Sequence, residues 1–323
     1  MQQRWLRCVV AGWIALIVLG ELLIRTAARD WGVIAVFDLV QPWWYAPTLP
    51  CLLLVLISHQ RRGTMVLLLV GAVWLTQYGA RWLPKSPATA PANLRVLTWN
   101  VAGWNVNIAD LDRVISAENP DIIALQEVDE ALREPLLARW RDRYPWSEIR
   151  LPTEPGLQPA DLAVFSRYPF AASPLDCPYW QCYRRALAVD VNGRELTLIN
   201  VHIEHSPVQT WHGIPSGIAN ERETRTIRRL LADTAIWNGP LLIMGDFNTT
   251  ERQTGYALLA ARWSDTWHEQ GRGLGLTWPR TTLTPPLLRL DYIWHSPHFT
   301  ATHATVGSGA SDHRYVVADL YWQ

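Results

Sequence analysis

The stretch Leu241–Asn248 (LLIMGDFN) joins a short apolar run to a polar end. A short apolar run of this kind predicts a β-strand. Asp246 and Asn248 follow the run. Because residues two apart point to the same side of a strand, both side chains can reach one site. The stretch therefore predicts a core strand that delivers a carboxylate and an amide to its end.

The same arrangement recurs along the chain from residue 94 to residue 323. Short apolar runs predict strands, amphipathic stretches predict helices over residues 108–118 and 222–237, and Asn107 is the expected cap of the first helix. A mixture of strands and helices in one long segment predicts an α/β domain with packed sheets. The expected strands are residues 94–99, 122–126, 162–166, 186–191, 196–201, 241–245, 290–294 and 316–321.

Nearly every expected strand ends in a carboxylate, an amide or an imidazole. A single aspartate at a strand end is usually a cap or a turn residue, so the prediction of a site depends on the whole set. Oxygen ligands without a close cluster of His and Cys favour Mg²⁺, Mn²⁺ or Ca²⁺ over zinc. Besides the pair in the first stretch, the set contains Asn100, Glu127, Asn200, His202, Asp291, Asp312 and His313.

These segments resemble, in order, the motifs of the endonuclease/exonuclease/phosphatase superfamily, whose fold is that of deoxyribonuclease I. The resemblance spans about 220 residues and implies a four-layer α/β sandwich of two packed mixed sheets, with the active site at one end. The matching segments are LTWNV at residues 97–101, LQEVD at 125–129, VFSRYP at 164–169, NVH at 200–202, GDFN at 245–248, LDY at 290–292 and SDH at 311–313.

The resemblance implies a metal site that holds Mg²⁺ or Mn²⁺. By position, Glu127 would be the principal metal ligand. Asn100 and Asp312 would complete the coordination shell or the layer behind it. Mg²⁺ commonly takes one or two protein carboxylates and leaves the other positions to water and phosphate, which suits this small set.

The resemblance also assigns the reacting groups. Asp246 would orient or deprotonate the attacking water, and Asn248 would bind the scissile phosphate. Asp291 would hold His313, which would polarise a phosphate oxygen or act as the general base. His202 matches a histidine of deoxyribonuclease I-like and sphingomyelinase-like members and is expected to help catalysis and substrate binding. Abasic-site nucleases tend to have Tyr there, which counts against a role in abasic-site repair.

Two further residues near the expected strand 290–294 are candidates for substrate contact. Trp278 and Arg289 lie close in sequence to Asp291. Ordinary packing for the tryptophan and a surface charge for the arginine are equally reasonable interpretations.

The region before residue 84 has three apolar stretches, at roughly residues 8–24, 44–58 and 65–80. A bilayer core requires about 20 apolar residues per helix, so we expect residues 1–83 to form a membrane region with three transmembrane helices. The second stretch reaches this length only when it is extended back through residues 34–40. A cleaved signal peptide is the alternative for the first stretch. Residues 84–93 are Pro-rich and predict an extended linker to a catalytic domain at 94–323.

The side of the membrane is not determined by charge. With three spans, four basic residues flank the helices on each side, so the positive-inside rule gives no answer. Cys177 and Cys182 bracket a turn-like stretch, and a small disulfide there would suit an extracytoplasmic domain, although two free thiols are an equal alternative. We expect an integral protein of a bacterial inner or plasma membrane and favour an extracytoplasmic catalytic domain.

Charge separates the functional hypotheses. Eight of the 29 basic and three of the 29 acidic residues precede residue 94, so the remainder carries about five net negative charges. Nonspecific DNA binding usually requires basic excess. We therefore favour a membrane-anchored phosphoesterase that acts on a lipid headgroup or another small phosphoester, including nucleotides. The alternatives are a DNA or RNA nuclease of the same superfamily and a catalytically silent binding module. The sequence indicates no protein partner.

Overall fold

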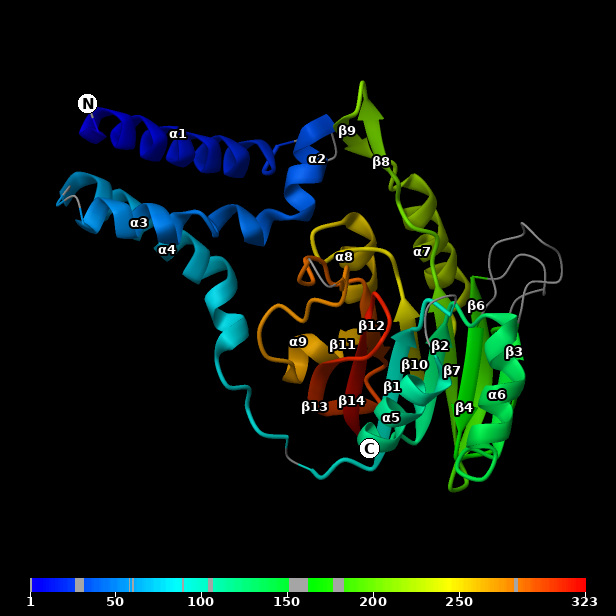
Figure 1. The fold of residues 1–323 in the computed structure, drawn as a ribbon. Helices are drawn as coiled ribbons and strands as arrows, with labels where there is room; N and C mark the ends of the chain where they lie inside the picture. Colours follow the sequence, from blue (N-terminus) through cyan, green and yellow to red (C-terminus); the bar gives the residue numbers. More distant parts are fainter. Residues whose placement is uncertain are drawn as a thin grey trace. The chain divides into compact units, whose positions relative to one another are not determined.

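The computed structural model describes residues 2–26, 32–57, 59, 61–88, 90–103, 107–150, 162–176, 183–281 and 284–323. The chain forms two compact units (Figure 1). Residues 1–83 and 207–220 make up the first unit, and residues 84–206 and 221–323 make up the second. No pattern in the sequence indicated that residues 207–220 group with the N-terminal helices.

The first unit consists of apolar helices and one small hairpin. Its hairpin packs on α2 at two glycines: a side chain at Gly32 would begin 3.2 Å from the Ser216 carbonyl oxygen, and one at Gly217 would begin 3.7 Å from the Gly32 nitrogen. The elements are α1 (Gln2–Leu23), α2 (Gly32–Leu39), η2 (Gln41–Tyr45), α3 (Thr48–Ile57), α4 (Arg61–Tyr78), η3 (Gly79–Trp82), β8 (Val208–Trp211) and β9 (Ile214–Ile218).

The outer faces of these helices are apolar. Leu19, Leu53 and Leu69 are each more than half exposed, and many similar side chains surround them. Arg61–Trp82 is long and apolar enough to cross a membrane, whereas Cys8–Leu23 is apolar but shorter. Exposed apolar area of this extent requires a lipid or protein environment. The expectation of three spans remains a prediction.

The second expected span is interrupted. Gly32–Leu39 and Gln41–Ile57 together have the composition of a span, but they are bent by 80° at the break between them. Pro42 lies directly after the break, and proline has no backbone N–H and clashes with the preceding helical turn. The extension of this span back through residues 34–40 is therefore bent at the break, and the second span remains a prediction.

Polar side chains join three helices of the first unit. Tyr45 donates to Glu21 (2.7 Å), Gln77 donates to Glu21 (3.3 Å), and Gln41 donates to both Glu21 and Gln77. Hydrogen bonds of this kind hold helices together where the surroundings are apolar.

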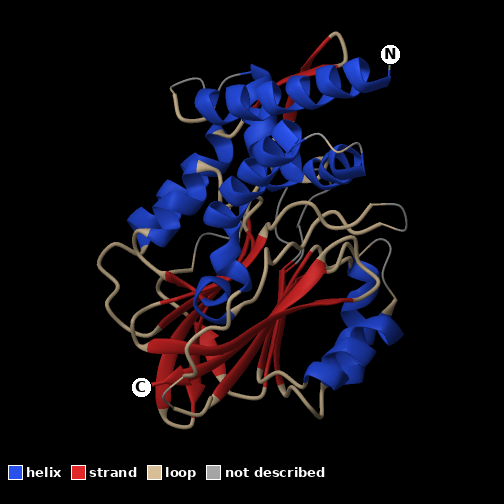
Figure 2. Ribbon diagram, turned by 90° about the vertical axis from the view of Figure 1, so that its left-hand side faces the viewer, coloured by secondary structure: helices blue, strands red, loops and turns tan. Residues whose placement is uncertain are grey.

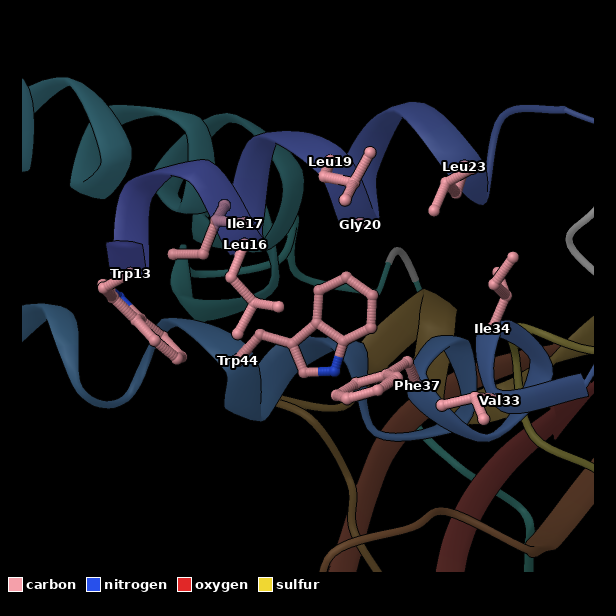
Figure 3. Close-up of a pocket in the computed structure, with 10 residues that line it drawn as sticks. All are labelled: Trp13, Leu16, Ile17, Leu19, Gly20, Leu23, Val33, Ile34, Phe37 and Trp44. Atoms are coloured by element: carbon pink, nitrogen blue, oxygen red, sulfur yellow. The ribbon is translucent and has the colours of Figure 1, made fainter. Parts of the chain in front are cut away.

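An apolar cavity of about 250 Å³ lies between α1, α2 and η2, with Trp44 and Phe37 on one side and Leu16, Leu19 and Leu23 on the other (Figure 3).

The second unit contains two packed six-stranded sheets, as expected (Figure 2). Both sheets are mixed, because β1 runs parallel to β2 and β7 runs parallel to β10 while all other pairs are antiparallel. The strand order is β13-β14-β1-β2-β4-β3 in the first sheet and β11-β12-β10-β7-β6-β5 in the second.

The strands of the second unit include four that the sequence did not predict, namely β3, β5, β11 and β13. The bounds are β1 (Leu94–Asn100), β2 (Ile122–Gln126), β3 (Trp146–Arg150), β4 (Leu162–Ser166), β5 (Phe170–Ala172), β6 (Arg184–Val191), β7 (Arg194–His202), β10 (Leu241–Asp246), β11 (Ser264–Asp265), β12 (Asp291–His295), β13 (Phe299–Ser308) and β14 (Arg314–Trp322). The helices are α5 (Ile108–Glu118), α6 (Glu130–Trp140), α7 (Glu221–Asp233), α8 (Thr254–Ala260) and α9 (Thr266–Gln270).

The apolar core has three layers: one between the two sheets, and one between each sheet and the helices on its outer face. The strand β10 contributes to two of these layers, so its apolar run is continuous. Leu242 and Met244 face the other sheet, whereas Leu241 and Ile243 pack with α7 and α8. The outer face of the first sheet packs in the same way against α5 and α6. Helices therefore cover the outer faces of both sheets. A strand that is buried on both faces gains free energy from apolar residues at every position.

Candidate active site

The inward face of each central strand changes from apolar to polar at one end. In β10 the residues that face the other sheet are Leu242, Met244 and then Asp246. Asp246 pairs with His202 of the parallel β7 and with Asp291 of the antiparallel β12. Parallel strands bring their carboxyl ends to one edge, and the antiparallel neighbour begins there. The register therefore gathers three of the expected residues at one edge.

An amide connects the two sheets at this edge. Asn100, the last residue of β1, is fully buried and donates from Nδ2 to Glu127 Oε1 (2.8 Å) and to Asp246 Oδ2 (3.0 Å). Its Oδ1 accepts from the Ala102 N–H (3.1 Å). His202 Nε2 lies 3.6 Å from Glu127 Oε1. In this geometry Asn100 faces the carboxylates as a donor, so it orients Glu127 rather than offering a metal its oxygen.

The expected Asp–His pair is present. His313 Nδ1 lies 2.9 Å from Asp291 Oδ2, and its Nε2 lies 3.8 Å from Asp246 Oδ2. Burial alone would lower the pKa of His313, but the charges of Asp291 and Asp246 outweigh it and raise the pKa to about 10. Burial and the charge of Asp291 raise the pKa of Asp246. These charges favour the imidazolium form of His313, which lies between the two carboxyl groups.

Two hydroxyl groups hold this pair in place. Ser311 donates to the Asn100 carbonyl (2.7 Å) and accepts from the His313 N–H (3.0 Å). Thr277 Oγ1 accepts from the N–H groups of Leu290 (3.0 Å) and Asp291 (3.3 Å). Sequence reasoning assigned neither of these roles, although Ser311 belongs to the quoted SDH segment. Hydrogen bonds of this kind fix the direction of a reactive side chain.

Two residues of the site have an uncommon backbone conformation. Glu127 (φ +54°) and Asn248 (φ +48°) both adopt the left-handed region, which is uncommon for residues other than glycine. Asn248 keeps this conformation because its N–H donates to Asp246 Oδ1 (2.9 Å) and its Nδ2 donates to the Ile203 carbonyl (2.8 Å). Gly245 (φ +146°) has no room for a side chain, since a Cβ would lie 2.0 Å from the Val201 carbonyl oxygen.

Asn200 lies two residues before His202 on the same face of β7, but it occupies a different position. It is fully buried and donates to the carbonyl oxygens of Leu125 (2.9 Å) and Ala163 (3.0 Å) in the opposite sheet. Its Oδ1 accepts from Gln126 (2.7 Å). This amide pair fastens the two sheets together beneath the site.

Two expected substrate contacts differ in outcome. Trp278 lies beside the site, with its ring centroid 6.3 Å from that of His313. Arg289 is 4 % exposed and pairs with Glu251 (2.7 Å) and Asp265 (2.5 Å). A buried guanidinium keeps its carboxylate partners, so these pairs support a packing role, and contact between Arg289 and the substrate remains a prediction.

The structure brings some, but not all, of the expected metal ligands into contact with one another. Glu127 keeps about a third of its side chain exposed. Asp312 is half-buried, and among the described residues its carboxyl contacts Ser311 (3.4 Å) and has no recorded contact with Glu127. Ligand atoms of Asp246, Asp291 and His313 lie within 4.8 Å of one another. Within the part of the chain that the structure describes, Asp291 Oδ1 is buried and has no hydrogen-bond partner.

These donors fit a divalent cation that prefers oxygen ligands. Glu127 would hold it, Asn100 would orient that carboxylate, and Asp291 offers an oxygen atom that has no partner among the described residues. The loops at residues 151–161 and 177–182, including the expected thiol pair Cys177 and Cys182, lie outside the described residues.

A two-sheet sandwich with carboxylates, amides and an Asp–His pair at one end defines a class of phosphoester hydrolases. The sequence pattern of the endonuclease/exonuclease/phosphatase family matches residues 97–313, and the chain belongs to this family. Its members are hydrolases of phosphoesters and generally depend on divalent metal ions. No curated protein matches the sequence.

Solved structures share the fold at low identity. One is an endonuclease/exonuclease/phosphatase family protein from Bacteroides thetaiotaomicron, with a TM-score of 0.53, 15 % identity, and coverage of 72 % of this chain and 99 % of that one. Another is D. rerio TDP2 complexed with a single-strand DNA product (0.53, 20 %, 71 % and 98 %). A third is the mannosyl-6-phosphatase Bt3783 of B. thetaiotaomicron (0.52, 17 %, 71 % and 100 %).

Proposed function

We propose that this protein is a divalent-metal-dependent phosphoesterase that is anchored in a lipid bilayer by its N-terminal helices. The observation that carries the proposal is the bridge from Glu127 through Asn100 to Asp246, beside the Asp291–His313 pair. The bridge brings two carboxylates and an imidazolium from both sheets to one edge. Phosphoryl transfer requires groups that stabilise charge on the phosphate oxygens and a group that accepts a proton from water.

The positions of the side chains suggest a division of roles. Mg²⁺ or Mn²⁺ at Glu127 would supply Lewis-acid stabilisation of a phosphate oxygen. His313 enters as an imidazolium because its pKa is raised to about 10, so it stabilises negative charge and does not accept the proton. Asp246 is then the general base that orients and deprotonates the attacking water. Asn248 binds the phosphate, and His202, with about a sixth of its side chain exposed, contributes a second imidazole.

Exposed apolar helices and the acidic balance of residues 94–323 support a substrate at a membrane. The first unit exposes large apolar side chains on every long helix, and about five net negative charges discourage nonspecific binding to nucleic acid. We therefore propose a lipid headgroup or another small phosphoester as the substrate. We also propose a bacterial inner or plasma membrane location with an extracytoplasmic catalytic domain, which a reporter fused after Gln323 would test.

The decisive experiment measures hydrolysis by the full chain in detergent with Mg²⁺ or Mn²⁺. The substrates are bis(4-nitrophenyl) phosphate, sphingomyelin, phosphatidylinositol phosphates and plasmid DNA. We expect Glu127→Ala and His313→Ala to lower kcat by roughly a thousandfold, as expected for the loss of a group that stabilises the transition state. Glu130→Ala is the matched control, because this exposed glutamate lies on α6 near Glu127. Activity that survives both site variants would refute the proposed site.

The plasmid tests the nuclease alternative. The solved structure of TDP2 holds a DNA product on a similar fold, so the fold itself accommodates nucleic acid. A preference for DNA over the lipid and aryl substrates would replace the lipid proposal while leaving the proposed site intact.

A further inference from the structure

A glutamate occupies a core position of α7. The buried face of this helix consists of Glu223, Ile227 and Leu230, which recur at helical spacing. Glu223 is fully buried, whereas its neighbours Glu221 and Arg222 are exposed. Burying a carboxyl group costs free energy unless hydrogen bonds or protonation compensate. A glutamate in place of a leucine therefore calls for a role beyond packing.

The carboxyl group of Glu223 is packed against the backbone of α8. A Cβ on Gly255, the second residue of that helix, would lie 2.0 Å from Glu223 Oε1 and 3.0 Å from Thr249 Oγ1. Only glycine leaves this space, and the carboxyl group and the Thr249 hydroxyl both lie beside it. The other oxygen, Oε2, is 3.5 Å from the Thr224 hydroxyl. Within the described part of the chain, Glu223 Oε1 and the hydroxyls of Thr249 and Ser206 form no regular hydrogen bond.

The groups around this carboxyl belong to the two segments that carry site residues. Thr249, which lies beside the carboxyl group, directly follows Asn248; Ser206, whose hydroxyl also acts on the carboxyl group, lies four residues after His202. The two segments already touch at one point, where Asn248 Nδ2 donates to the Ile203 carbonyl (2.8 Å).

We propose that Glu223 is a positioning residue whose carboxyl group holds the segment after His202 against the turn that carries Asn248. The proposal rests on the phosphoesterase function proposed above. A protonated carboxyl group can donate its O–H to one of the two neighbouring hydroxyls and accept from the other. A carboxylate can only accept, and it would remain a buried charge without a cation.

The surroundings favour the protonated form near neutral pH. Burial raises the pKa of Glu223 to about 7, and the hydroxyls of Thr249, Thr224 and Ser206 oppose this rise. No charged residue on the packed segments contributes to the shift. The nearby titratable side chains have other surroundings: Glu204 pairs with Arg222, His205 and Arg225 are exposed, Glu251 binds Arg289, Tyr256 binds Asp265, and Arg252 is half-exposed.

Glutamine at position 223 tests the proposal, because its amide donates and accepts at every pH. The full chain is assayed in detergent with Mg²⁺ on bis(4-nitrophenyl) phosphate, between about pH 5.5 and 8.5. We expect the kcat/KM of Glu223→Gln relative to wild type to be near one at acidic pH. It should rise by roughly fivefold towards pH 8.5, because only the wild type loses its donor. Glu221→Gln, the same substitution on the exposed face of α7, should show a constant ratio.

An apolar replacement tests the link itself. Leucine suits a core position, so we expect Glu223→Leu to fold. Its kcat/KM should fall by roughly tenfold at acidic pH, which corresponds to the loss of about one hydrogen bond. A flat ratio for Glu223→Gln, or wild-type kcat/KM for Glu223→Leu, would overturn the proposal. If Glu223→Leu does not fold, the glutamine series decides alone.

Melting temperature separates this proposal from the proposed function. Between pH 6 and pH 8 the Tm of the wild type should fall relative to that of Glu223→Gln, while Glu221→Gln follows the wild type. This divergence in a protein that hydrolyses none of the substrates would refute the phosphoesterase function and leave the structural link standing. Parallel Tm curves for all three proteins would refute the buried proton at Glu223, whatever the activity.

Discussion

Replacement of Asn200 by Ala should weaken the contact between the two sheets and lower the free energy of unfolding. Three hydrogen bonds are lost: those from Asn200 to the Leu125 and Ala163 carbonyls and the one from Gln126 to Asn200 Oδ1. Each buried hydrogen bond contributes about 1 kcal/mol, and buried groups left without partners add to the loss. The free energy of unfolding should therefore fall by about 3–5 kcal/mol.

The assay is thermal unfolding of the full chain in detergent, followed by near-ultraviolet circular dichroism. A loss of this size should lower the Tm by roughly 6–15 °C in a domain of this length. Asn238→Ala is the control, because this asparagine is exposed in the loop before β10, and we expect a change below about 0.5 kcal/mol. A loss below about 1 kcal/mol for Asn200→Ala would show that the amide bridge does not fasten the sheets.

Four further outcomes follow from the geometry. Gly245→Ala should destabilise the protein by about 3 kcal/mol or more, measured by denaturant unfolding, because a Cβ would lie 2.0 Å from a carbonyl oxygen at φ +146°. Arg289→Ala should cost about 3–5 kcal/mol in the same assay, since it leaves Glu251 and Asp265 buried without their cation. Chelation with EDTA should abolish hydrolysis, Mg²⁺ or Mn²⁺ should restore it, and chelator-resistant turnover would contradict metal dependence. The pKa of Glu223 is about 7 in the folded protein and 4.5 in the unfolded chain, so the unfolded chain releases this proton first as the pH rises. The contribution of Glu223 to the free energy of unfolding should therefore fall by about 3 kcal/mol between pH 4.5 and pH 7. Urea titration at several pH values would measure this fall.

The central strands could be predicted because their physical causes are local. A strand that is buried on both faces must be apolar throughout, so β10 is visible as Leu241–Met244. The polar residue at its end follows the period of two, which places Asp246 on the same face as Leu242 and Met244. The ordered motifs then placed Glu127 and His313 at the same edge, where the structure also has them.

What the sequence did not reveal depends on distant partners or weak patterns. The edge strand β3 mixes polar and apolar residues, and the edge strand β5 has only three residues, so neither shows the long apolar run of a central strand. Arg289 was interpreted by its closeness to Asp291, but its carboxylate partners lie 24 and 38 residues away. Glu223 carried a detectable signal that was missed: a glutamate in register with Ile227 and Leu230 on an otherwise apolar helix face.

The hairpin of residues 207–220 affects how this protein can be shortened. A protein that begins at residue 84 would still contain β8 and β9, since they are inserted between β7 and α7, but it would lack α2. The backbone around Gly217 packs closely against Gly32 in the whole chain, and without α2 it would be exposed to solvent. Uncovered strands readily pair with other molecules. A water-soluble version therefore needs a tight turn in place of the hairpin as well as the removal of the N-terminal helices.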